Sequence, residues 1–356
     1  MTNDGYAAVA DYAERFHRAV GTKHHVASPL GAWLLIAMSG AGSQADAALA
    51  RALLDTPHPL VAAASAMWHA PQVEPPSLPA LPASTATGPL PDQAGLDRWA
   101  RENTFGLIEQ FPLKLSPEVV LILASALATR ISWQHPFELA PAETLGPDSP
   151  WAGRLTTVLR SPSPGHRALI ADSSTAGRVI VHEAGADGLR VLSVAADPGV
   201  PPGRVLAAAH EVAAARPVSL FDLPVGESPL YRVWEEPHAA KPGEFAHAVL
   251  PAWSAHNQHD LGADEFGFAA VAEKLGRDRF EAAQSVVARY DRYGFEAAAV
   301  TGFMSLTSFT PPGVARFAEL RFGHPYAVVA VATQPGGPWD GMPVFSAWVS
   351  DPDDAS

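Results

Sequence analysis

Cysteine is absent from this chain, so neither disulfide bonds nor thiol chemistry can contribute, and the redox compartment cannot be inferred. Positive charge is scarce as well, because 24 Lys and Arg residues stand against 37 Asp and Glu residues, for a formal net charge of −13. No basic stripe is available to neutralise phosphates, which argues against nucleic-acid binding. No apolar run approaches the roughly 18 residues of a membrane span. The N-terminal residues lack the basic and apolar segments of a secretory signal, so we expect no membrane contact and a cytoplasmic location.

Local motifs for catalysis or metal binding are few. Gly40–Ala45 fits a short dinucleotide-binding pattern, but Ser28-Pro29 makes the preceding run helical and residues 59–64 contain no acid, so we interpret the motif as a turn between helices. His24-His25 and His256-x-x-His259 have no third ligand at metal spacing and are predicted to be solvated loop histidines. Neither G-x-S-x-G nor S-x-x-K occurs. We expect no metal, no cofactor and no enzymatic activity; an enzyme of another fold is a third alternative, which rests only on the 14 histidines.

Apolar periodicity predicts helices in the first part of the chain and mostly strands afterwards. The expected helices are 4–20, 30–39, 44–54, 92–107, 202–215 and 267–275, and the expected strands are 119–128, 178–182, 189–194, 245–253, 284–290, 326–332 and 344–349. Ser28 is the expected N-cap of the second helix, the strand at 119–128 is expected to be covered on both faces, and the Pro-rich residues 71–91 are expected to be an irregular connection. No regular βαβ alternation is present, so the pattern favours a mixed α+β fold.

An Ala-rich segment, Tyr293–Thr301, separates the strand at 284–290 from residues 302–313, which have no periodicity. An extended chain points alternate side chains to opposite faces, and one face of this segment is made mostly of small residues. A segment of this kind could pass from a loop into a sheet, because small side chains avoid overpacking a closed site. The alternative is an ordinary helix, since Glu-Ala-Ala-Ala is also a good helix former.

Five segments resemble, in the correct order, the conserved blocks of the serpin family. They are Ala27–Leu30 with Ala37–Gly42, Leu121–Phe137, Val249–Ser254 followed by His259–Leu261, Phe322–Tyr326, and Phe345–Pro352. The resemblance implies a single, monomeric α+β domain over residues 1–356, metastable, with a large central mainly antiparallel sheet, a further sheet, about eight helices and an exposed reactive-centre loop.

The resemblance also implies a function and a set of site residues. A serpin-like inhibitor offers its loop to a serine protease, and the cleaved loop then inserts into the central sheet. The implied loop hinge is Gly294, Phe295, Glu296, Ala297, Ala298, Ala299, Val300 and Thr301, and the implied sheet-opening region is Ser28, Gly31, Ser125, Trp133 and Gln284. The reactive bond is expected near Ser308-Phe309, and residues 307–314 contain no Lys or Arg, which points to an elastase-like or chymotrypsin-like protease.

Three departures from the family pattern favour a second function. Phe295 stands where inhibitors usually carry a small hydroxyl residue, Gly31 stands for a serine, and Gln284 stands for a histidine. The last two changes imply a reduced hydrogen-bond network and could leave space for the ring of Phe295. The alternative is therefore a non-inhibitory serpin-fold binding protein whose loop does not insert. The family resemblance also leaves an extracellular location open.

Overall fold

The computed structural model describes residues 2–74, 76, 78, 81–163, 165–212, 216–238, 243–277, 279–295 and 313–356. The expected hinge residues 296–301 and the expected bond 308–309 lie outside these described residues. Within them, no helix is long and apolar enough to cross a membrane.

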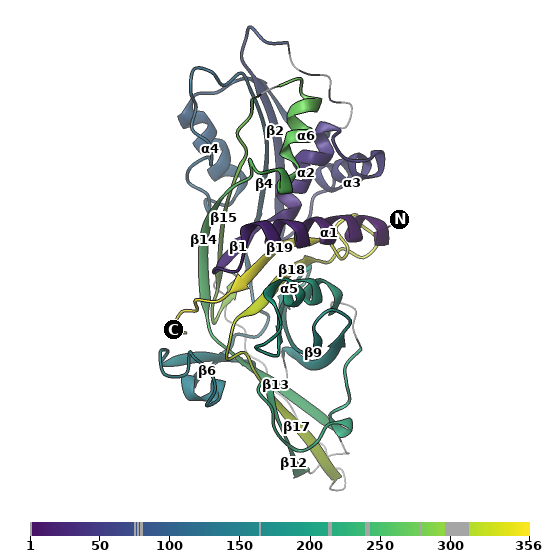
Figure 1. Cartoon of the computed structure of the whole chain (residues 1–356), viewed down its shortest axis with the longest axis vertical. Coiled ribbons are helices and arrows are strands. Elements are labelled where there is room, and N and C mark those ends of the chain that lie inside the picture. Colours follow the sequence, from purple (N-terminus) through teal and green to yellow (C-terminus); the bar gives the residue numbers. More distant parts are fainter. Residues whose placement is uncertain are drawn as a thin grey trace.

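Six α-helices lie in the described residues, where the resemblance implied about eight. They are α1 (Thr2–Val20), α2 (Pro29–Ser39), α3 (Gln44–Asp55), α4 (Gln93–Asn103), α5 (Pro202–Glu211) and α6 (Phe268–Lys274). Figure 1 shows α2, α3, α4 and α6 toward one end of an elongated molecule and α1 near its middle, while the strands β12 (Tyr231–His238), β13 (Glu244–Leu250) and β17 (Gly313–Arg321) extend at the other end. All six occur where the sequence pattern predicted a helix.

The centre of the helical end is α2, which is apolar on every side and therefore buried. The hydroxyl of Ser28 accepts a hydrogen bond from the backbone N–H of Gly31, and Pro29 occupies the first turn, as predicted. Gly40 ends the helix with a φ of 76°, a left-handed conformation that glycine adopts without strain. The glycine-rich motif is thus the turn between α2 and α3.

Nineteen strands form the remaining regular structure of the described chain. They are β1 (His25–Ala27), β2 (Val61–His69), β3 (Ala86–Pro89), β4 (Leu121–Thr129), β5 (Ile131–Ser132), β6 (Glu138–Pro141), β7 (Thr157–Arg160), β8 (Arg167–Ser173), β9 (Gly177–Ala186), β10 (Leu189–Ala196), β11 (Gly226–Glu227), β12 (Tyr231–His238), β13 (Glu244–Leu250), β14 (Trp253–Asp260), β15 (Ala283–Tyr290), β16 (Gly294–Phe295), β17 (Gly313–Arg321), β18 (Tyr326–Ala332) and β19 (Pro343–Val349).

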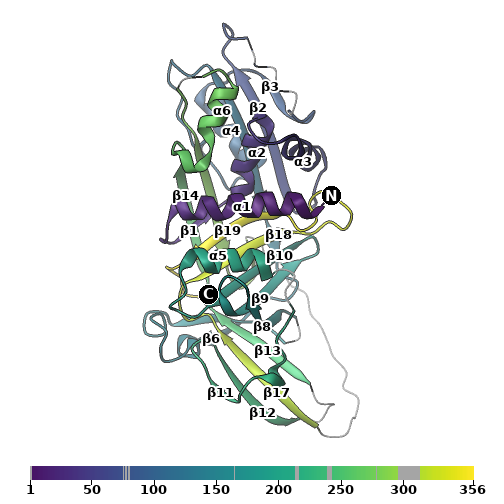
Figure 2. The ribbon, with the colours of Figure 1, turned by 45° about the vertical axis from the view of Figure 1, so that its right-hand side comes forward.

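Two six-stranded sheets form one part of the molecule. The first has the order β1-β19-β18-β10-β9-β8, and Figure 2 shows α1 and α5 lying along its strands β18 and β19. The second has the order β11-β12-β17-β13-β7-β6 and is antiparallel except where β13 runs parallel to β17. The remaining strands form a three-stranded sheet, β3-β2-β4, and the pairs β14-β15 and β16-β5.

Four expectations from the sequence need correction. The strand predicted at 245–253 is two strands, because Pro251 has no backbone N–H to continue a ladder and β14 begins at Trp253. The connection at 71–91 contains a short strand, β3. One face of β4 is buried and the other only half-buried. His25 and His259 are not solvated loop residues, since they lie on strands and are 2% and 8% exposed; the described residues nevertheless contain no group of three or more metal-binding side chains.

Candidate functional site

A cavity of about 480 Å³ lies between strands β4 and β15. Among the described strands, β4 pairs only with β2, and β15 pairs only with β14. Each strand therefore turns toward the cavity an edge without a described strand partner. An edge of this kind presents a row of backbone donors and acceptors that can pair with another strand. The central sheet expected from the family resemblance is thus divided into two parts in this structure.

The walls of the cavity are mainly apolar. Side chains from β4, from α4 and the loop after it, and from α6 line it together, among them Leu123, Leu127, Trp99, Ile108, Phe268 and Val271. Ser28, Ser125 and Gln284 are among the polar side chains that also line it. An apolar space with a few polar groups is a typical binding site, and here it runs along two strand edges.

Four of the predicted sheet-opening residues lie together in this cavity, and their polar atoms are well bonded. The amide of Gln284 pairs twice with the backbone of Ser28: its Oε1 accepts from the Ser28 N–H at 3.0 Å, and its Nε2 donates to the Ser28 carbonyl at 2.7 Å. On the other side, the hydroxyl of Ser125 donates to the carbonyl of Gly31 at 2.7 Å. Helix α2 thus holds both strands, β15 through Gln284 and β4 through Ser125.

The glycine at position 31 is explained by this arrangement. A Cβ atom there would lie 3.3 Å from Leu127 Cδ1, 3.3 Å from Ser28 Oγ and 3.5 Å from Gln284 Nε2. The side chains of Leu127, Ser28 and Gln284 therefore leave little room for a side chain at position 31. Gln284, which stands where the family pattern has a histidine, supplies two hydrogen bonds to the backbone of Ser28.

The gap between the two parts of the sheet is closed at one end. There β5 pairs with β16, with Ile131 opposite Phe295 and Ser132 opposite Gly294. The backbone N–H groups of Trp133 and Phe137 donate across the gap to the carbonyls of residues 293 and 292, both at 3.0 Å. The indole of Trp133 adds a bond to the carbonyl of residue 291 at 2.9 Å. We call this set of cross-gap bonds, made by residues 131–137 and 291–295, the closed end.

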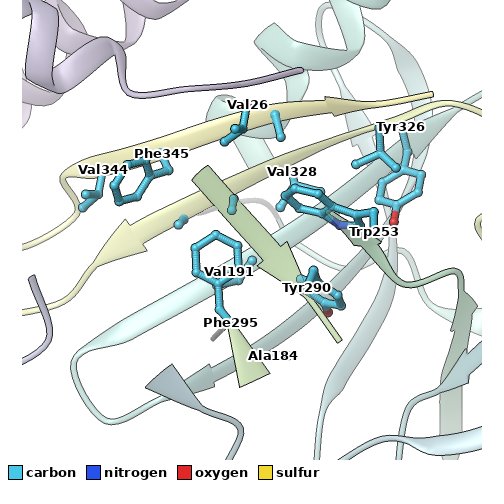
Figure 3. Close-up of a cluster of buried hydrophobic side chains, with 14 of the residues drawn as sticks. Val26, Ala184, Val191, Trp253, Tyr290, Phe295, Tyr326, Val328, Val344 and Phe345 are labelled. Atoms are coloured by element: carbon cyan, nitrogen blue, oxygen red, sulfur yellow. The ribbon is translucent and has the colours of Figure 1, made fainter. Parts of the chain in front are cut away.

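Phe295 is an integral part of the closed end. It is 5% exposed, and its ring meets that of Trp253 edge to face at a centroid distance of 6.3 Å. Trp253 in turn stacks on Tyr290 at 6.1 Å. Figure 3 shows Phe295, Tyr290 and Trp253 in one cluster with Val191 and Val328. The Phe295 ring is therefore buried before any loop insertion, because Gly294 and Phe295 already pair with β5.

Two histidines and Tyr290 lie against the closed end; His182 and Tyr290 are buried, and His166 is half-buried. Burial and the neighbouring His166 hold the pKa of His182 well below its usual range, and burial lowers the pKa of His166 to about 4. Burial also raises the pKa of Tyr290 above its usual value, so the phenol keeps its proton. The ring of Phe137 lies 4.5 Å from His166 and 5.3 Å from His182, centroid to centroid.

The structure therefore divides the predicted residues into two groups. Ser28, Gly31, Ser125 and Gln284 line the cavity, whereas Trp133, Gly294 and Phe295 form the closed end. Sequence reasoning missed His166, His182 and Tyr290. No signal in the sequence marks them, because they come from three separate segments that only the packing of β9 and β15 brings together.

Comparisons with protein-family sequence models and with curated protein sequences find no match. Solved structures match over nearly the whole length. Tengpin, a thermophilic serpin in its native state, matches with a TM-score of 0.64 at 15% identity, over 99% of this chain and 95% of that chain. A serpin from the trematode Schistosoma haematobium matches with a TM-score of 0.60 at 13% identity, over 99% of this chain and 100% of that one.

Human thyroxine-binding globulin in complex with thyroxine matches similarly, with a TM-score of 0.60 at 14% identity over 99% of this chain and 98% of that chain. Identities this low establish the fold alone. The chain has the serpin fold, which is the fold that the order of its motifs predicted.

Proposed function

We propose that this protein is a single-domain, monomeric inhibitor of a serine protease that works by loop cleavage and loop insertion. The observation that carries the proposal is the cavity between β4 and β15, toward which both strands turn edges without a described partner. A strand inserted there can form backbone hydrogen bonds with both neighbours at once, which is the physical basis of strand addition. Because the chain would act as a substrate that is consumed, it is not proposed to be an enzyme.

The length of the chain is compatible with such an insertion. Seventeen residues, 296–312, connect the end of β16 to the start of β17. A cut at 308–309 would release the thirteen residues 296–308, which span about 43 Å if fully extended at about 3.3 Å per residue. Strand β4 has nine residues, or about 30 Å by the same rise. The released arm can therefore reach along all of β4.

An elastase-like or chymotrypsin-like protease is the proposed partner. Residues 307–314 contain no Lys or Arg, and the first basic residue after them is Arg316. Its side chain is 14% exposed, pairs with Glu235 at 2.8 Å and donates to the carbonyls of Leu220 and Leu223. A trypsin-like enzyme cannot take this guanidinium into its specificity pocket without breaking these bonds. We therefore expect no stable complex with trypsin cut at Arg316, as judged by denaturing gel electrophoresis.

A second candidate function is that of a non-inhibitory binding protein with a serpin fold. The buried position of Phe295 favours it, because insertion of the downstream residues would have to disturb a ring that already packs on Trp253. The likeness to thyroxine-binding globulin illustrates that the fold also occurs in a protein solved with a small ligand.

Thermal unfolding before and after cleavage of the loop separates the two candidates. A protease that cuts within 302–314 is used to nick the chain, and the melting temperature of the nicked protein is compared with that of the intact protein. Insertion predicts a large rise, since a new strand would fill the cavity and satisfy both edges. The matched control is Ala298→Pro, nicked at the same bond, because proline is not tolerated inside a central strand. An unchanged melting temperature in the nicked wild type would support the binding protein instead.

A further inference from the structure

One side of strand β4 faces the interior of the protein without being fully buried. Side chains alternate between the two faces of a strand, and the odd positions from 121 to 127 face α2, since the hydroxyl of Ser125 donates to the carbonyl of Gly31 and Leu127 lies beside that glycine. These odd positions are half-buried, whereas the even positions, which pack with α4, are buried. The incomplete burial marks the side of β4 on which the cavity lies open.

Apolar side chains of two helices complete this side of the cavity. Figure 1 shows α2 and α6 on one side of β4 and α4 on the other. Leu35 of α2 and Leu275 at the end of α6 line the same cavity as Leu123 and Leu127, and all four side chains are half-buried. We call these four residues the leucine wall. Covering such a wall with an apolar ligand is favourable, because apolar surface is removed from water.

One cation that lines the cavity has a buried donor without an acceptor. Gly276 follows α6 in a left-handed conformation, with a φ of 64°, and the backbone N–H of Arg277 donates to the carbonyl of Ala272 at 2.9 Å, so the helix end fixes the position of Arg277. Within the described residues, the buried Nε–H of Arg277 has no hydrogen-bond partner. An unsatisfied buried donor is costly, and a carboxylate is the group that the guanidinium fork binds best.

The charges that line the cavity leave a cation over at this place. Three are positive and two are negative: Lys114, Glu118, Arg277, Arg279 and Glu281. Arg279 pairs with Glu118 at 3.6 Å, which joins the loop before β15 to the loop before β4. Lys114 and Glu281 are exposed to solvent, and their charges cancel. Asp278 lies outside the described residues, so the charge that remains within them is that of Arg277.

We propose that the cavity binds a fatty acid, with its carboxylate on Arg277 and its acyl chain along the leucine wall. The cavity volume of about 480 Å³ is in the range of about 300–1,000 Å³ that small-molecule sites occupy. An acyl chain on this wall contacts side chains and leaves the backbone edges of β4 and β15 to water. Binding needs neither a protease nor a cut, so the site goes beyond the proposed inhibitor, and it gives the second candidate function a ligand of defined chemistry.

The same site has a consequence for loop insertion, and this consequence rests on the proposed function. Alternate side chains of an inserted strand point to the inner side of the sheet, where the acyl chain lies. The two occupants therefore exclude each other. A bound fatty acid should reduce the stabilisation that follows cleavage of the loop.

Isothermal titration calorimetry of the intact chain with octanoate, decanoate and dodecanoate tests the site. Each acid is used below the concentration at which it forms micelles. We expect one molecule bound per chain and an affinity that rises about fourfold for each added methylene. Equal affinities across the series, or several equivalents bound with no dominant site, would overturn the proposal.

Substitution of Arg277 separates the carboxylate contact from the apolar wall. Arg277→Gln should weaken dodecanoate binding about tenfold or more and change the binding of the uncharged 1-dodecanol much less, whereas Leu123→Gln should weaken both. Arg101→Gln is the matched control, because Arg101 is an exposed residue of α4 that does not line the cavity. Arg277→Lys keeps the charge without the guanidinium fork, so it should give an intermediate loss and supplies the comparison if Arg277→Gln fails to fold.

Two results with the Arg277 variants contradict the carboxylate contact: an unchanged affinity for dodecanoate, or an equal loss for dodecanoate and 1-dodecanol. Melting of the nicked protein remains a separate measurement. Binding of dodecanoate without stabilisation by the nick refutes the inhibitor and leaves the fatty-acid site intact, and stabilisation without binding does the reverse. Where both occur, dodecanoate added before the nick should reduce the rise in melting temperature, and an undiminished rise would show that the acid does not lie in the path of the inserted strand.

Discussion

Removal of the Phe295 ring should destabilise the intact protein strongly. Phe295 is 5% exposed and packs against Trp253, so Phe295→Ala should cost about 3–5 kcal/mol, the usual range for a buried phenylalanine. At about 2.1 cal/mol/K per residue, the unfolding entropy of 356 residues is about 0.75 kcal/mol/K. A loss of about 4 kcal/mol therefore lowers the melting temperature by about 5 °C.

The assay is thermal unfolding followed by circular dichroism, with Tyr293→Ala as the control. Tyr293 lies two residues away and is 41% exposed, and its ring contacts Arg292 at the surface. Its truncation should therefore change stability by at most about 0.5 kcal/mol. This comparison separates loss of buried packing from a general effect of shortening an aromatic side chain in this segment.

The same variants measure the role of Phe295 in insertion. If the ring hinders insertion, Phe295→Thr should melt earlier when intact, yet gain more on nicking and give more protease complex than wild type. If the ring supports insertion, Phe295→Thr should show a smaller rise in melting temperature on nicking and a lower yield of protease complex than wild type. A melting temperature of intact Phe295→Ala within 1 °C of wild type would refute the packing on which this reasoning depends.

Three further predictions concern other parts of the structure. Gln284→Ala removes two hydrogen bonds to Ser28 and should cost about 2 kcal/mol in chemical denaturation, whereas an unchanged midpoint would mean that water replaces the amide. Burial lowers the pKa of His25 to about 4, so its neutral ring contributes fully to folding stability above pH 6.5. The free energy of unfolding should fall by about 3 kcal/mol as the pH drops to 4, and His25→Gln should flatten this pH dependence. Limited proteolysis should cut first within residues 302–314, and first cuts at 71–91 would contradict the loop assignment.

Much of the secondary structure could be predicted because its causes are local. The Ser28 cap and Pro29 at the first turn mark the start of α2, and the alternation on both sides of Asp187-Gly188 gives the hairpin of β9 and β10. The fold itself followed from the order of family-like blocks along the chain. Boundaries were less accurate where one residue interrupts a ladder, as Pro251 does between β13 and β14.

The candidate site was predicted only in part. Sequence comparison with the family pattern pointed to Ser28, Gly31, Ser125 and Gln284, and the structure brings them into one cavity. It could not predict that Gln284 bonds to the backbone of Ser28, because the two residues are 256 positions apart and the bond depends on how closely β15 approaches α2. The hinge beyond Phe295 and the reactive bond remain predictions.

The sequence by itself determined most of the elements and their order, because capping, turn formation and apolar periodicity depend on residues that are close together along the chain. The serpin fold was predicted from the order of the family-like blocks. Only the tertiary structure decided how the central sheet is divided, that Phe295 is buried at its closed end, and that Tyr290, His182 and His166 lie together beside it. These features depend on which strand edges meet and on which side chains share a buried space. No local pattern specifies either, since both arise from packing between segments that are separated along the chain.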